Sequence, residues 1–164
     1  MTLRLETYLR ELRDIRASGA GVNEISYYHP LANLLNELGK SLKPKVRCIL
    51  NLRNRGAGIP DGGLFTAEQL KRTATDEWNE GQIPNRGVLE VKGTGVELVV
   101  LAGSEQVARY LQRYGLILIT NLRDFAIVGS LVQANHVLIV GLHGGGDLGF
   151  EGFNRHAGHT MPNL

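Results

Sequence analysis

Residues 86–120 place a helical pattern between two strand patterns, and this order constrains the fold more than any other feature of the sequence. The strand segments are RGVLEVKG and LILIT, which are rich in the branched aliphatic residues that favour β-strands. Between them, GSEQVARYLQRYG begins with a serine N-cap closely followed by Glu and Gln, and it continues at helical period to Gly115. Strands of one sheet that are joined through a helix are usually parallel, so an α/β layered fold is predicted.

The rest of the chain predicts two more helices and three more strands. Leucine and isoleucine recur at helical spacing over residues 3–17 and 24–39. The second helix is expected to have Asn23 as its N-cap, with Pro30 at a bend or in its first turn. Further strands are predicted at KVRCILNL, at the end of the glycine-rich NRGAGIPDGGLF and at DFAIVGS, and residues 67–79 are expected to form a weakly helical surface insertion. The expected core order is α-β-β-β-α-β, with a mixed central β-sheet flanked by helices.

The length of 164 residues suits one domain. We expect it to span residues 1–140, because residues 141–164 are rich in glycine and have no usable period, which is typical of a loosely ordered tail. The sequence has no apolar run of about 18 residues and no signal-peptide pattern, so a cytoplasmic protein without membrane contact is expected. The only cysteine, Cys48, excludes an internal disulfide and a zinc site built on paired cysteines.

The net charge of +2 does not by itself indicate nucleic-acid binding. Basic residues do gather in one region, where only Glu37 is a nearby acid: Lys40, Lys43, Lys45, Arg47, Arg53 and Arg55. Such a strip fits either a solvated face or a contact with the phosphates of nucleic acid, and both interpretations stay open.

The candidate active residues are Asp61, Glu90 and Lys92. Asp61 follows Pro60 in a glycine-rich turn and, taken alone, fits an ordinary turn carboxylate. Glu90 and Lys92 lie two apart on a strand, so their side chains point to the same face, while the neighbouring residues are apolar. Such a pair is costly to bury unless it has partners, and its apolar flanks argue against an ion pair on a solvated edge strand.

This set of residues suits the hydrolysis of phosphodiester bonds. Two carboxylates held close together repel each other, and a divalent cation between them removes the repulsion. Oxygen ligands favour Mg²⁺, which keeps several waters and accepts a phosphate oxygen as a further ligand. Such a metal lowers the pKa of a bound water, and Lys92 would orient that water or stabilise the negative charge on the phosphate.

Pro60-Asp61 followed by Glu90-Val91-Lys92 resembles the PD…ExK signature of the PD-(D/E)xK nuclease superfamily. Gln106 and Tyr110 match the QxxxY motif of its RecB-like members, and Glu24 corresponds to an acidic residue that many members have on the preceding helix. Segments such as RGVLEVKG are similar to the N-terminal nuclease regions of type ISP and type IIG restriction–modification enzymes. The sequence differs from those enzymes because it contains no methyltransferase motif.

The resemblance implies a restriction-endonuclease-like core and a Mg²⁺-dependent deoxyribonuclease, with Mn²⁺ as a substitute. The implied catalytic residues are Asp61, Glu90, Lys92, Glu24 and Gln106, and the implied metal ligands are Asp61, Glu90, Val91 and Glu24. DNA contacts are implied for Gln106, Tyr110, Arg55 and Asn54. The implied partners are DNA, a methyltransferase or helicase module of the same restriction–modification system, and a second copy of the chain.

Several alternatives remain at this point. Some members of the superfamily have lost activity, so an inactive module that binds nucleic acid or protein is the second hypothesis. Glu24 would also stabilise the positive end of its own helix dipole. Gln106 and Tyr110 would also fit the surface and the core side of an ordinary helix.

Overall fold

The computed structural model describes residues 2–19, 24–52, 58–73, 83–131, 134–141 and 149–153, with the backbone alone at 2–3, at Glu24, at 72–73 and beyond Gly129. In chain order the elements are α1 (Thr2–Ser18), the 3₁₀ turn η1 (Glu24–Tyr27), α2 (Tyr28–Gly39), β1 (Val46–Leu50), β2 (Gly62–Thr66), α3 (Ala67–Thr73), β3 (Val88–Val91), α4 (Leu98–Ala102), α5 (Glu105–Tyr114), β4 (Leu116–Thr120), β5 (Phe125–Leu131), β6 (Ala134–Gly141) and β7 (Gly149–Phe153). None of the helices in these ranges combines the length and the apolar character that crossing a bilayer requires.

The described strands form one seven-stranded mixed sheet in the order β1-β2-β3-β4-β5-β6-β7. β3 and β4 are parallel, with Val88 beside Ile117 and Val91 beside Thr120. Every other neighbouring pair is antiparallel. The parallel pair is the one whose strands are joined through α4 and α5, which confirms the expectation from the strand–helix–strand order of residues 86–120.

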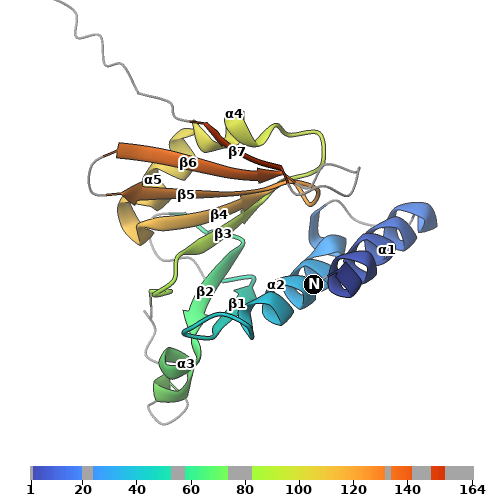
Figure 1. Cartoon of the computed structure of the whole chain (residues 1–164), viewed down its shortest axis with the longest axis horizontal. Coiled ribbons are helices and arrows are strands. Elements are labelled where there is room, and N and C mark those ends of the chain that lie inside the picture. The colour runs from blue at the N-terminus through green and yellow to red at the C-terminus, as the bar shows by residue number, and fades with distance from the viewer. Residues whose placement is uncertain are drawn as a thin grey trace, which may run out of the picture.

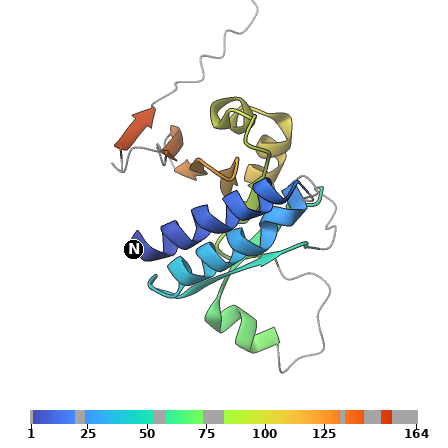
Figure 2. The same cartoon turned by 90° about the vertical axis from the view of Figure 1, so that its right-hand side faces the viewer.

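Helices cover both faces of the central strands, and two apolar clusters fill the space between the layers. α1 and α2 lie side by side, as Figures 1 and 2 show, and pack with Leu89 and Val91 of β3. α4 and α5 pack on the opposite face, with Val88 of β3 and Ile117 of β4. Successive residues of β3 therefore point into opposite apolar layers, which is why this strand is apolar at nearly every position.

The predicted helices are confirmed, with a difference at the start of α2. The α-helix begins at Tyr28 after the turn η1, and Pro30 lies in its first turn, where a missing N–H is tolerated. Asn23, predicted as the N-cap, lies outside the described residues, and the capping position belongs to Tyr27, whose side chain makes no capping bond. α5 matches the prediction, since Ser104 Oγ accepts a hydrogen bond from the Val107 N–H at 3.2 Å.

Three elements were not predicted. α4 has the sequence LVVLA, a short aliphatic run whose period does not separate a helix from a strand. β6 extends the sheet beyond β5. β7 falls within the stretch expected to be a loose tail, and it pairs with β6 from Val137–Phe153 to Gly141–Gly149. Backbone pairing along an existing sheet defines this strand, and backbone pairing leaves little trace in side-chain periodicity.

Candidate active site

The central strand β3 holds Glu90 in the interior of the protein. β3 lies between β2 and β4, so it is not an edge strand, and Glu90 is only 1% exposed. The neighbouring residues Leu89 and Val91 face the α1–α2 layer, as the alternation of the strand predicts. A solvated ion pair at a sheet edge is therefore excluded for Glu90.

Asp61 reaches this strand because β2 and β3 separate at this point. The β2–β3 ladder ends at Gly62 and Leu89, so the Val91 N–H, which faces the same side of β3 as that of Leu89, lies beyond the ladder. The Asp61 side chain takes that place, and its Oδ2 accepts a hydrogen bond from the Val91 N–H at 2.7 Å. Its Oδ1 accepts a hydrogen bond from the Tyr28 hydroxyl at 2.6 Å. One carboxylate thus connects α2, β2 and β3.

The Glu90 carboxylate has one well-paired oxygen and one unpaired oxygen. Lys92 Nζ and Gln106 Nε2 donate to Oε1 at 2.6 and 2.8 Å. Gln106 Nε2 also donates to the Tyr110 hydroxyl at 3.2 Å, across one turn of α5. Glu90 Oε2 is buried and has no hydrogen-bond partner among the described residues. Lys92 is partly exposed, with 30% of its side-chain surface accessible.

The surroundings raise the pKa of Glu90 above its ordinary value. Burial is the largest cause, and the negative charge of Asp61 adds to it. The hydrogen bonds and charge supplied by Lys92 and Gln106 act in the opposite direction but do not cancel the rise in the pKa. The negative charge of Asp61 thus disfavours the charged form of Glu90.

This rise in pKa predicts how stability depends on pH in the metal-free protein. A carboxyl group with a raised pKa in the folded state contributes stability at low pH, and that contribution is lost as the pH rises through the folded value. With a chelator present, Glu90→Gln should therefore be more stable than the wild type at about pH 8, and the difference should shrink toward about pH 5. Urea unfolding at both pH values measures this. A variant that is less stable than the wild type at the higher pH would contradict the prediction.

The donor set fits a hard divalent cation. All the side-chain ligands on offer are carboxylate oxygens, and an unpaired buried oxygen on Glu90 faces no competing donor within the described structure. Mg²⁺ commonly binds through one or two carboxylates and completes its shell with water and phosphate. The described ranges contain no group of three or more His, Cys, Asp or Glu residues placed to hold a metal, so Asp61 and Glu90 are the pair available.

Of the remaining predicted residues, some are described by the structure and others lie outside its described part. Glu24 lies in η1, but its side chain is outside the described part, as are Asn54 and Arg55 altogether. Val91 meets the site through its N–H, which bonds Asp61 and cannot bind a cation, so a metal ligand from Val91 would have to be its carbonyl oxygen. Lys92 and Gln106 both contact Glu90.

Tyr110 requires a correction. It was expected to contact DNA, but it is 1% exposed and packs in the cluster between α5 and the sheet. Its hydroxyl bonds Gln106, and burial raises its pKa. Gly58 also covers it, because a Cβ on Gly58 would lie 3.2 Å from the Tyr110 hydroxyl oxygen. Tyr110 therefore contacts Gln106 through its hydroxyl from the protein interior, and its buried ring is not accessible to DNA.

The part that Tyr28 plays in the site was not predicted from the sequence. Tyr28 lies within the second predicted helix, is 9% exposed and packs in the α1–α2 layer. Its hydroxyl bonds Asp61. A buried tyrosine hydroxyl needs a polar partner, so the signal was present, but the sequence does not identify which partner it meets.

Comparison with known proteins supports the fold. A chain in the cryo-EM structure of a DrdV–DNA complex aligns with 77% of this chain at a TM-score of 0.54 and 21% sequence identity. This protein spans about 11% of the length of that chain. The likeness, together with the mixed sheet flanked by helices, confirms the predicted α/β, restriction-endonuclease-like fold class. No family profile and no curated protein matches the sequence.

Proposed function

We propose that this protein is a DNA-cleaving domain that hydrolyses phosphodiester bonds with Mg²⁺, as part of a restriction–modification system. The observation on which the proposal depends is the convergence of Asp61, Glu90 and Lys92, with one Glu90 oxygen buried and unpaired. The fold shared with a chain of a protein–DNA complex supports DNA as the partner. The resemblance of Pro60-Asp61 and Glu90-Val91-Lys92 to a nuclease signature supports hydrolysis as the reaction.

Each residue has a role in this proposal. Asp61 and Glu90 would hold the cation, whose chemistry is to lower the pKa of a bound water and to offset charge on the leaving oxygen. Lys92 is close enough to Glu90 to be positioned by it and exposed enough to reach a phosphate. Its ammonium group would stabilise negative charge on that phosphate. Gln106 would act as a positioning residue, because it bonds the same Glu90 oxygen as Lys92.

The direct test is cleavage of supercoiled plasmid by the purified protein. We expect nicked or linear DNA with Mg²⁺ or Mn²⁺ and intact plasmid with a chelator. Ca²⁺ serves as a further control, since it takes oxygen ligands but prefers more of them and a looser geometry. Cleavage that continues in excess chelator would contradict the proposed dependence on a metal.

A binding measurement separates this proposal from an inactive module on the same fold. We expect calorimetry to detect Mg²⁺ binding to the wild type and no binding to Glu90→Gln. Bound Mg²⁺ should also raise the melting temperature of the wild type, because a ligand that binds only the folded state stabilises it. DNA binding that is indifferent to Mg²⁺, with no calorimetric signal, would favour the inactive module.

A further inference from the structure

A positively charged pocket lies beside the candidate active site. It has a volume of about 720 Å³, and its walls come from α1, η1, the loop after β3 and the turn between β4 and β5. Three arginines line it: Arg13, Arg16 and Arg123. No carboxylate is among the residues that line it in the described part of the chain. Arg13 and Arg16 are exposed on α1, and Arg123 has 65% of its side-chain surface accessible.

The pocket and the candidate active site are built from neighbouring residues. β3 and β4 are parallel, so the segments that follow them emerge at the same edge of the sheet. Gly93, which lines the pocket, directly follows Lys92. Tyr27, which also lines it, directly precedes the Tyr28 that bonds Asp61. A polymer lying across this edge would meet the carboxylates and the arginines in succession.

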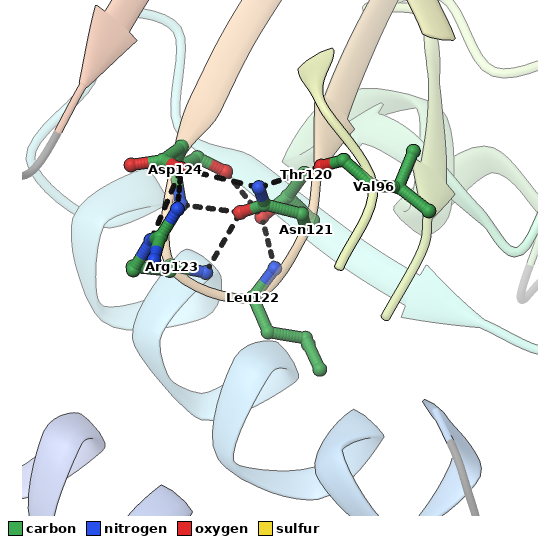
Figure 3. A network of polar contacts seen from close by, with 6 residues as sticks. All are labelled: Val96, Thr120, Asn121, Leu122, Arg123 and Asp124. Atoms are coloured by element: carbon green, nitrogen blue, oxygen red, sulfur yellow. Dashed lines mark hydrogen bonds and ion pairs between the residues drawn. The ribbon is translucent and has the colours of Figure 1, made fainter. Parts of the chain in front are cut away.

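The turn that presents Arg123 is held in place by a polar network, shown in Figure 3. Asn121 is 2% exposed, and its Oδ1 accepts the backbone N–H groups of Arg123 and Asp124 at 3.1 and 2.7 Å. Its Nδ2 donates to the Val96 carbonyl at 2.9 Å, which ties the turn to the loop after β3. The Leu122 carbonyl accepts the Tyr8 hydroxyl at 2.7 Å, which ties the turn to α1. The pocket walls are therefore fixed to one another.

The charges in the pocket are only partly compensated. Arg123 donates from Nε and Nη2 to Asp124 Oδ2, at 3.2 Å in each case. Among the described residues, Asp124 is the one carboxylate that forms an ion pair with any of these three arginines. Like charges that gather with too little counter-charge repel each other, and an anion bound in the pocket would reduce this repulsion.

The loop after β3 leaves room over its glycines. A Cβ added to Gly93 or Gly95 would meet no atom within 4 Å, and neither residue has a positive φ. The fold of this chain therefore does not require glycine at either position. Both residues line the pocket, where the absence of side chains lets an outside group approach the backbone.

We propose that this pocket binds backbone phosphates of duplex DNA next to the phosphate that is cut, with Arg13 and Arg16 each contacting one. Guanidinium groups match phosphate oxygens in geometry as well as charge. Each DNA strand supplies one negative charge per about 3.4 Å of helix axis, so a duplex held at the carboxylates brings further phosphates to the arginines. The part of this inference that places a cut at the neighbouring phosphate rests on the proposed function. The part that places phosphate binding in the pocket does not.

The test measures the salt dependence of binding by fluorescence anisotropy, with a labelled DNA duplex of about 20 base pairs in EDTA, so that no cleavage is required. The double variant Arg13→Gln/Arg16→Gln should lower the slope of log K against log salt by about 2, because each lost phosphate contact lowers it by about 0.9. Between 50 and 200 mM salt, the wild type should therefore lose roughly tenfold more affinity than the double variant. Arg13→Lys/Arg16→Lys, which keeps the charges, should restore most of the slope.

The matched control is Arg10→Gln, which removes the same charge from an exposed position on α1 that does not line the pocket. It should leave the slope near the wild-type value, and circular dichroism should show equal helix content in every variant. A wild type that fails to bind the duplex, or a double variant with the wild-type slope, overturns the inference. A wild type that binds through these arginines but cuts no DNA overturns the proposed function alone.

Discussion

Asp61→Asn is expected to abolish plasmid cleavage while leaving the fold intact. The Asn oxygen can still accept the Val91 N–H, and the Asn amide can donate to the Tyr28 hydroxyl, so both hydrogen bonds of the carboxylate survive. What is lost is the negative charge that would hold the cation. Removing one electrostatic contribution to a transition state commonly lowers kcat by about 10²–10³, and losing a metal ligand should reach at least that range. Single-turnover cleavage of plasmid at saturating protein measures the loss.

The control for this experiment is Glu68→Gln, which removes one negative charge from an exposed position on α3, away from the candidate site. It should cut at the wild-type rate.

Lys92→Ala should lose plasmid cleavage, as Asp61→Asn does, because the ammonium group that would stabilise negative charge on the phosphate is gone. Thermal unfolding should give similar midpoints for the wild type, Asp61→Asn and Glu68→Gln in the metal-free state, whereas Lys92→Ala should melt lower because it leaves the buried Glu90 without one of its partners. Normal nicking by Asp61→Asn would remove the basis for assigning the site.

Gly87→Ala is expected to destabilise the protein severely. Gly87 has φ +98°, a backbone conformation that is strained for a residue with a Cβ, and the added Cβ would lie 2.3 Å from the Leu116 carbonyl oxygen. The strained backbone alone costs about 1–3 kcal/mol, and the contact with a backbone atom of β4 adds to it. Domains of this kind are stable by about 5–15 kcal/mol in total, so a loss of several kcal/mol is a large fraction. Urea unfolding followed by circular dichroism measures the change.

The matched substitution is Gly103→Ala. Gly103 has φ −86°, and the nearest atom that its added Cβ would meet is the Val100 carbonyl oxygen at 3.7 Å, an ordinary contact. It should change stability by about 0.5 kcal/mol or less. Equal unfolding midpoints for the two variants would show that Gly87 is not confined as the structure indicates.

The layer architecture could be predicted because it depends on local patterns. β3 and β4 are aliphatic on both faces, and Ser104 and Gly115 delimit α5, so the crossover and the parallel pair follow from sequence. The shared face of Glu90 and Lys92 follows from strand alternation alone. β7 could not be predicted because its pairing with β6 uses backbone groups, and a glycine-rich segment leaves no periodic trace.

The finer contacts of the site depend on how separate elements pack. The bond from Tyr28 to Asp61 depends on the position of α2 over the sheet, and no pattern within α2 specifies that position. The arginine pocket joins α1 to a turn more than a hundred residues later, so charge spacing along the chain could not reveal it. The burial of Tyr110 beneath Gln106 likewise required the packing of α5 against β3 and β4.

The parallel pairing of β3 with β4 has a consequence for how activity develops during synthesis and refolding. β4 can join β3 only after the whole connection through α4 and α5 has been made, and such distant contacts form late because closing the loop between them costs entropy. Gln106 meets Glu90 only when that connection is docked. A nascent or half-folded chain in which α5 is not yet docked therefore lacks the contact between Gln106 and Glu90.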